Sequence, residues 1–385
     1  MITDSPHLYR QTALAQSVPP EFLDLLIRAA YETERHGLQA VLTLKHLAHQ
    51  TGADHSYLRN VIGRDTDPYD EFLLQGKRLI SSPHPAIRAV QKWILANILG
   101  RVACHPASFA YERNKSIAQC ARRHLGAKWL VKLDIHNFFP SIDEREVFRI
   151  FTELGYRQLI SFEMARLCTR PGIGALHKIP TDRPPSRSDY TTIRKYRTTA
   201  GVGYLPQGSP TSGALANLAM RLIDERITEA ISGTSIIYTR YADDITFSTA
   251  EKFSRQDAVD LIRMTDRILR LKGFLRHERK TKVVPPGARK IVLGILVDSD
   301  HIKIPIDTRN RLVNDIRGAE KFGLLAHAHH RNFSSALGFG EHISGMLSYC
   351  HDVDPGWTEP LWKRWSIVLR NHNIPLTSTR HTDKN

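Results

Sequence analysis

Apolar residues recur at three- and four-residue spacing towards both ends of the chain, and this period is typical of amphipathic helices. Near the N-terminus the pattern covers residues 20–49, and near the C-terminus it covers residues 307–370. The sequence therefore predicts a helical N-terminal extension over residues 1–65 and a helical region over residues 301–375. The polar residues 376–385 are expected to form a flexible tail.

The middle of the chain alternates between helical patterns and short runs of branched apolar residues. Residues 129–135 indicate a buried strand, and the alternation over residues 236–248 indicates a β-hairpin. Residues 170–203 hold four prolines and seven Lys or Arg with little apolar periodicity, so we interpret them as a basic insertion. Helices mixed with antiparallel strands predict an α+β fold, with the main catalytic unit over residues 66–300.

The composition narrows the class of partner without naming a function. Lys and Arg number 54 against 39 Asp and Glu, which gives a formal net charge of +15, and 41% of the residues are hydrophobic. The apolar content supports a large core and excludes disorder, while the positive charge favours polyanions such as nucleic acid. No apolar run is long enough for a bilayer and no leader is evident, so we expect a cytoplasmic chain with no membrane partner.

Two adjacent acids, Asp243 and Asp244, fall at the turn of the hairpin predicted over residues 236–248. Carboxylates held together between hydrophobic strands repel each other unless a cation lies between them. A third acid, Asp134, ends the strand predicted at residues 129–133. If these strands are neighbours in one sheet, the three acids form a site for two divalent ions, and Mg²⁺ suits such oxygen ligands. An ordinary exposed Asp-Asp turn is the alternative.

Three segments resemble, in chain order, core motifs of reverse transcriptases. They are residues 133–142 (LDIHNFFPSI), residues 205–212 (LPQGSPTS) and the tetrapeptide Tyr241-Ala242-Asp243-Asp244. The similarity covers about residues 66–350, and its character is that of bacterial retron enzymes. The resemblance implies a right-hand polymerase fold, with fingers and an antiparallel palm sheet over residues 66–300 and a helical thumb over residues 301–375.

The resemblance also implies a catalytic set. Asp134, Asp243 and Asp244 are expected to bind two Mg²⁺ ions, for which Mn²⁺ can substitute, with the backbone carbonyl of Ile135 as a further ligand. Lys280 matches the lysine that protonates the leaving pyrophosphate. A solvated basic face is the plain structural alternative for this lysine, because residues around it are rich in Lys and Arg.

A second implied group of residues contacts the substrates. Phe139 matches the steric gate that excludes a ribose 2′-hydroxyl, although packing in the core explains a phenylalanine equally simply. Gln207 and Gly208 match the loop beside the template base and the incoming nucleotide, and Lys77 and Arg78 are expected triphosphate contacts. The residues expected to bind nucleic acid are Tyr241, Arg276, Lys282, Arg289 and Lys290.

The implied function is RNA-directed DNA polymerisation, in which a primer hydroxyl attacks a dNTP and expels pyrophosphate. In the retron scheme the chain copies a structured noncoding RNA into a small RNA-linked DNA in anti-phage defence, beside an effector or toxin protein. A second copy of the chain, in a homo-oligomer, is a further candidate partner. The chain leaves too little beyond the thumb for a ribonuclease H domain, so a separate enzyme is expected to remove RNA.

Two departures from the retron pattern leave alternatives open. Cys120 stands where retron enzymes carry the Asn of Asn-Ala-x-x-His, and Leu293 stands where they carry the Thr of Val-Thr-Gly. A non-retron defence-associated reverse transcriptase, including a template-independent or protein-primed enzyme, is therefore an alternative. A catalytically idle RNA-binding scaffold is disfavoured, because all three carboxylates and the Pro-Gln-Gly loop are present.

Overall fold

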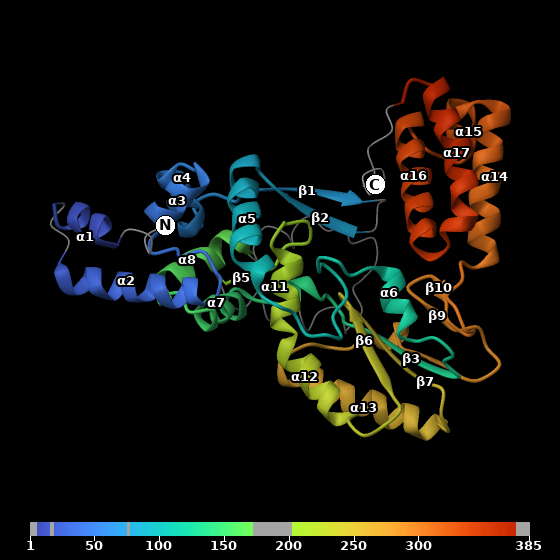
Figure 1. The fold of residues 1–385 in the computed structure, drawn as a ribbon, viewed down its shortest axis with the longest axis horizontal. Helices are drawn as coiled ribbons and strands as arrows, with labels where there is room; N and C mark the ends of the chain where they lie inside the picture. Colours follow the sequence, from blue (N-terminus) through green and yellow to red (C-terminus); the bar gives the residue numbers. More distant parts are fainter. Residues whose placement is uncertain (1–5, 16–18, 75–77, 172–201, 375–385) are drawn as a thin grey trace.

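The fold is taken from a computed structural model, which describes residues 6–15, 19–74, 78–171 and 202–374 (Figure 1). Lys77, nearly all of the predicted basic insertion and the tail at 376–385 lie outside the described residues. Helices and antiparallel strands alternate along the chain, which confirms the α+β class. Among the described helices, none combines the length and the apolar character that crossing a bilayer requires.

The N-terminal part is helical, as the apolar period predicts. Its helices are α1 (Pro6–Ala15), α2 (Pro20–Arg35), α3 (Leu44–Thr51) and α4 (His55–Gly63). The side chains of Thr43 and Asp54 accept hydrogen bonds from backbone N–H groups in the first turns of α3 and α4, which fixes where these helices begin. Leu47 and Leu58 are completely buried in the same core as the central sheet. The pair α3–α4 is therefore packed on the larger body of the protein.

An antiparallel hairpin of β1 (Tyr69–Leu74) and β2 (Arg78–Pro83) follows and reaches towards the C-terminal helices (Figure 1). The sequence pattern does not predict this hairpin, because Phe72, Leu73 and Leu74 are three consecutive apolar residues without polar residues between them. In the structure all three side chains are exposed. The elements that come next are α5 (Pro85–Asn97), η1 (Leu99–Arg101) and α6 (Ile117–Arg122).

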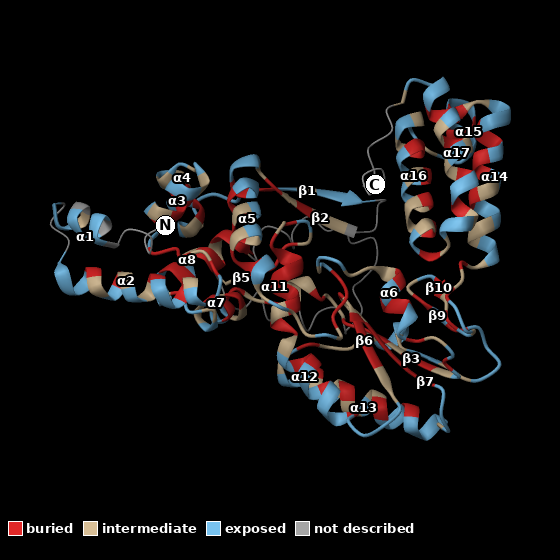
Figure 2. Cartoon of the chain, in the orientation of Figure 1, coloured by how far each residue is buried: buried red, intermediate tan, exposed pale blue. Residues whose placement is uncertain are grey.

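The described strands build a four-stranded antiparallel sheet in the order β6–β7–β3–β8. These strands are β6 (Ile237–Tyr241), β7 (Asp244–Thr249), β3 (Trp129–Asp134) and β8 (Lys282–Val284). The strands predicted around residues 129–135 and 236–248 are thus neighbours. Figure 2 shows burial along β3, β6 and β7, which is expected for strands that are covered on both faces.

Helices and short pairs of strands surround this sheet. They are η2 (Phe139–Ser141), α7 (Glu144–Glu153), α8 (Gln158–Cys168), β4 (Arg170–Pro171), β5 (Gly203–Tyr204), α11 (Ser212–Ala219), α12 (Arg221–Ala230), α13 (Arg255–Leu271) and η3 (Glu278–Lys280). In Figure 1, α12 and α13 run along the lower side of the sheet, whereas α11 rises beside it. Small residues of α11 are buried, so this helix packs closely against its neighbours.

The C-terminal helices pack around a second core, which also includes residues of α6 and Leu130 of β3. This part of the chain contains β9 (Ile291–Val292), β10 (Ile295–Leu296), α14 (Ile306–Phe322), α15 (Leu324–His330), α16 (Ala336–Val353) and α17 (Pro355–Asn371). The apolar run at residues 291–297 contains the hairpin β9–β10. Its two-residue turn places both Leu293 (φ 50°) and Gly294 (φ 85°) in the left-handed region that tight hairpins require.

A buried ion pair ties the sheet to the helices below it. Arg240 of β6 and Asp224 of α12 are both fully buried, with Nη2 2.7 Å from Oδ2 and Nε 2.9 Å from Oδ1. The Tyr238 hydroxyl donates to the same carboxylate at 2.6 Å. The remaining nitrogen, Nη1, donates to the carbonyl of Ala242 at 3.1 Å. Because both charges are paired and hydrogen-bonded, the pair fixes the end of β6.

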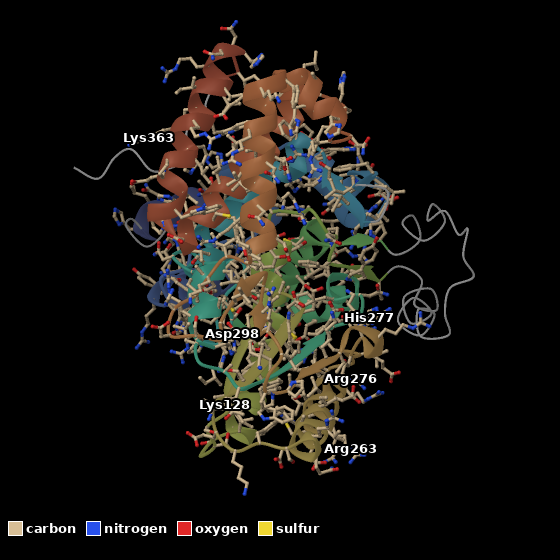
Figure 3. The ribbon with its side chains drawn as sticks, turned by 90° about the vertical axis from the view of Figure 1, so that its right-hand side faces the viewer. Lys128, Arg263, Arg276, His277, Asp298 and Lys363 are labelled. Carbon is tan, nitrogen blue, oxygen red and sulfur yellow. The ribbon has the colours of Figure 1, made fainter. Side chains whose placement is uncertain are left out.

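We expect Asp224→Ala to destabilise the protein by about 3–5 kcal/mol, because it leaves the Arg240 guanidinium buried without a counter-charge. Urea denaturation followed by circular dichroism measures the loss. The matched control is Asp260→Ala, which breaks an exposed pair with Arg263 on the outer side of α13 (Figure 3) and is expected to cost less than about 1 kcal/mol. Equal losses in the two variants would contradict the assigned role of the buried pair.

Candidate active site

The three predicted acids lie together at one end of the central sheet. Asp134 is the last residue of β3, Asp244 is the first residue of β7, and the two are directly opposite in the antiparallel register. Asp243 belongs to the two-residue turn between β6 and β7. Ile135 donates its N–H to the carbonyl of Asp243 at 3.0 Å. Since the N–H and C=O of a strand residue point to the same side, the Ile135 carbonyl also faces this turn.

The turn that carries Asp243 has a strained backbone, and a hydrogen bond from a buried side chain holds it in place. Ala242 has φ 55°, a left-handed conformation that costs free energy for any residue with a Cβ. Its carbonyl accepts the hydrogen bond from buried Arg240, whose position is set by Asp224. Sequence reasoning missed both supporting residues. The available signal was a charged residue, Arg240, within a strand predicted to be buried.

Charge is crowded at this end of the sheet. Burial raises the pKa of Asp243, and the charges of Asp134 and Asp244 raise it further. Burial also raises the pKa of Asp244, with Asp134 adding to the effect and Lys132 opposing it. Lys280 supplies the direct counter-charge, because its Nζ donates to both carboxylate oxygens of Asp134 at 2.9 and 3.0 Å.

The donor set fits hard divalent ions. Within the described ranges, no group of three or more His, Cys, Asp or Glu side chains already converges on a common point. The carboxylates nevertheless lie on neighbouring backbone positions, and burial together with the nearby acids raises the pKa of Asp243 and of Asp244, which are the conditions under which a cation is favoured. The Lys280 side chain is 58% exposed on a flexible stem, so its ammonium can leave Asp134 when an ion replaces it.

The residues predicted to face the nucleotide lie on two neighbouring segments. Phe139 is half-buried in η2, beside Phe138 with 5.4 Å between ring centroids. The Gln207 carbonyl accepts a hydrogen bond from the Ser81 N–H of β2 at 2.8 Å. Gly208 has φ 122°, and a Cβ there would lie 2.7 Å from the Ser81 carbonyl oxygen. Glycine is therefore required by close approach to β2, and the loop is attached to the β1–β2 hairpin.

The predicted basic contacts are placed differently from one another. Arg78 opens β2, whereas Lys77 is outside the described residues. Arg276 lies beside His277 between α13 and β8 (Figure 3) and donates to the Thr281 hydroxyl at 2.9 Å. Lys282 is exposed on β8, the strand that pairs with β3.

The other three residues predicted to bind nucleic acid lie in different surroundings. Tyr241 ends β6 opposite Asp244, and burial raises the pKa of its hydroxyl. Arg289 is exposed, but it faces a cavity bordered by α14 and the start of α17. Lys290 is only 3% exposed, and its ammonium donates to the carbonyls of residues 285 and 288. The Lys290 amine is thus used inside its own loop, and its contact with nucleic acid stays a prediction.

Comparisons with known proteins agree with this arrangement. The family described as reverse transcriptase (RNA-dependent DNA polymerase) matches residues 66–303, well over half of the chain. The chain is 28% identical to the Retron Ec86 reverse transcriptase of Escherichia coli over 277 residues, 72% of each chain. It is 29% identical to the Retron Mx162 reverse transcriptase of Myxococcus xanthus over 294 residues, 72% of this chain and 56% of that relative.

A solved structure is also similar to this chain, with a lower sequence identity than the retron enzymes. It is a telomerase from Candida albicans in complex with a fragment of telomeric RNA, with a TM-score of 0.40 and 10% identity over 81% of this chain and 64% of that chain.

We expect Asp243→Asn to raise the Tm of the metal-free protein by about 1–3 °C at pH 7.5, because it removes a buried charge beside two others. A folded-state pKa above the ordinary value of 3.8 makes the ionised acid destabilising. The gain in Tm of Asp243→Asn is therefore complete at pH values above the raised pKa of Asp243, and it disappears as the pH falls towards 3.8. Thermal denaturation in EDTA at several pH values measures it.

Asp260→Asn, on the exposed surface of α13, is the control and is expected to leave the Tm unchanged. Mg²⁺ should raise the Tm of the wild type more than that of Asp243→Asn, since bound ligand stabilises only the folded state that holds it. A lower Tm for Asp243→Asn in EDTA would show that the carboxylate makes a stabilising contact, contrary to the crowding described above.

Proposed function

The chain belongs to the reverse transcriptase family of RNA-directed DNA polymerases, and from this premise we propose that it extends a primer hydroxyl with dNTPs along an RNA template. The observation that carries the proposal is the register of β3 and β7, which sets Asp134 opposite Asp244 beside the turn of Asp243. The chain has the right-hand polymerase fold. We assign the β1–β2 hairpin to the fingers, the four-stranded sheet to the palm and helices α14–α17 to the thumb.

In this proposal the three carboxylates hold two divalent ions, Mg²⁺ or Mn²⁺, with the Ile135 carbonyl as a further ligand. Bound ions supply positive charge to the attacking and leaving oxygens of an in-line phosphoryl transfer. The primer hydroxyl loses its proton to solvent, its oxygen forms a bond to the α-phosphate, and the bond from that phosphate to pyrophosphate breaks. Lys280, released from Asp134, donates a proton to the leaving pyrophosphate, for which its exposed and flexible side chain is suited.

The fingers and the palm loop hold the incoming nucleotide. The hydrogen bond between Ser81 and Gln207 ties β2 to the loop, so movement of the hairpin would also move Gln207 and Gly208. Arg78, at the start of β2, is proposed to contact the triphosphate. Phe139 is proposed to lie under the sugar and to exclude a 2′-hydroxyl.

We further propose a retron-like role, in which the template is a dedicated structured noncoding RNA and the product is a small RNA-linked DNA made in anti-phage defence. The similarity to retron reverse transcriptases supports this choice. The net charge of +15 suits an RNA partner. We place the reaction in the bacterial cytoplasm, where dNTPs and RNA are synthesised, with an effector protein as a partner.

Cys120, which stands where retron enzymes carry Asn, fits among its neighbours in the structure. His124, which the chain shares with the retron pattern, is fully buried and lies 2.7 Å from both the Thr239 and Ser248 hydroxyls on neighbouring strands of the catalytic hairpin. Burial lowers the pKa of His124 to about 3, so the ring is neutral and joins the two hydroxyls as donor and acceptor. The Cys120 thiol contacts Thr239 at 3.4 Å and fills the remaining space. This supports a motif whose task is to brace β6 and β7.

The polymerase proposal is tested by primer extension on an RNA template with Mg²⁺ and dNTPs. Wild-type protein is expected to extend the primer, and the double variant Asp243→Asn with Asp244→Asn is expected to lose more than about 10³-fold in rate, because the ion-binding charge is removed. Asp260→Asn, an exposed change on α13, serves as the control and should retain most of the activity.

Extension by the double variant at the wild-type rate would contradict the assignment of the site. Product made from dNTPs without added template would favour the template-independent alternative. A wild-type chain that binds RNA but extends no primer would favour an idle scaffold.

The retron-like role predicts that the chain purifies with one RNA–DNA species. Sequencing the nucleic acid that copurifies from cells should give a single repeated RNA joined to a short DNA copied from part of it. Its retention should fall steeply with salt, because counterions are released on binding. Purification of the Asp243→Asn and Asp244→Asn double variant is the control and should retain the RNA without the DNA. Homopolymeric or random DNA would contradict the retron-like role.

A further inference from the structure

We propose that Tyr111 is a positioning residue for sugar selection, because it holds the ring of Phe139 in place. This inference rests on the proposed polymerase function. Tyr111 lies in the segment between η1 and α6, outside every motif that the sequence identifies. Its ring meets Phe139 edge to face, with 6.1 Å between centroids and 62° between planes.

Phe139 thus has two aromatic neighbours. Phe138 lies 5.4 Å away and is buried against Phe274 at 6.1 Å, which makes it part of the palm core. Tyr111 is 58% exposed, so it does not belong to that core. Tyr111 therefore contacts Phe139 from the solvent-exposed side of the palm core.

The backbone of α11 is shaped to receive the Tyr111 ring. A Cβ on Gly213, the second residue of α11, would lie 2.4 Å from Cγ and 2.7 Å from Cδ1 of Tyr111. No side chain heavier than hydrogen fits there without moving the ring. Because α11 begins just after the Gln207–Gly208 loop, the ring bridges the helix that follows this loop and the segment that carries Phe139.

The conformation of Tyr111 is costly and is enforced by its surroundings. Its φ of 59° lies in the left-handed region, where bulky residues are rare. On the preceding residues, the Ala110 carbonyl accepts from Asn217 Nδ2 at 2.7 Å and the Phe109 N–H donates to the Arg240 carbonyl at 2.9 Å. The segment is thereby fixed to α11 and to β6. Strain that is maintained by several contacts is typical of functional sites.

These contacts give a physical account of the proposed task. A steric gate discriminates only if its ring cannot tilt away from an added hydroxyl. Phe138 contacts the Phe139 ring from the palm core, and Tyr111 contacts the same ring from outside that core. Loss of the Tyr111 ring would leave space into which Phe139 can rotate, so a ribonucleotide would be admitted more easily.

The test compares single incorporation of dCTP and CTP opposite the same template base by kcat/KM. Tyr111→Ala is expected to lower the preference for dCTP by about 10-fold or more while dCTP use changes by less than about threefold, since one packing contact in a pocket is worth this order of discrimination. Tyr111→Phe keeps the ring and should retain the wild-type preference.

Gly213→Ala provides an independent variant that leaves Tyr111 present. Its added methyl should displace the ring and lower the preference for dCTP in the same way. When combined with Tyr111→Ala it should have no further effect, because the space is already vacant. Such coupling identifies contact between the two residues, which a general loss of stability does not produce.

An unchanged preference in folded Tyr111→Ala and Gly213→Ala would overturn the inference, as would equal losses for both nucleotides. Both outcomes leave primer extension by the wild type intact, so they do not affect the proposed function. A wild-type chain that incorporates neither nucleotide would refute the proposed function and this inference with it.

Discussion

Repulsion among three carboxylates is the constraint on which the rest of the structure depends. Asp134, Asp243 and Asp244 meet at one end of a sheet whose strands are buried, and the cost of ionising Asp243 and Asp244 is raised by burial and by the nearby acids. Lys280 neutralises part of this charge by binding both oxygens of Asp134. The site is therefore stable in the absence of ions only because one flexible cation is present, and it remains ready to exchange that cation for others.

The position of the acids depends in turn on a second charge, which lies below them. Arg240 reaches the Ala242 carbonyl from within the core, and Asp224 makes the burial of this guanidinium tolerable. A hydrophobic residue at 240 could pack equally well, but it could not donate to the strained turn. The buried pair is thus better understood as a support for the site than as a source of stability, which is consistent with the modest net value of buried ion pairs.

The sequence allowed the α+β class, the neighbouring strands and the three acids to be predicted, because periodicity and local motifs encode them. The β1–β2 hairpin escaped prediction since its exposed apolar residues, Phe72 to Leu74, do not alternate. The surroundings of Lys290 could not be predicted, because a sequence shows that a residue is basic but does not show which carbonyls its amine meets. Arg240 and Tyr111 were missed for a similar reason, since their partners lie on elements far along the chain.

The strained backbone positions show how the parts act together. Ala242, Asn137 and Tyr111 have φ of 55°, 47° and 59°, and they lie respectively beside the acids, just before Phe139 and against the Phe139 ring. Each is held by neighbours, since Arg240 binds the first, the Ser141 N–H donates to the Asn137 carbonyl, and α11 supports the third. A backbone held in costly conformations cannot relax when a substrate leaves. The geometry that the proposed ion binding and sugar selection need is therefore already present in the folded chain, so binding energy is not required to create it.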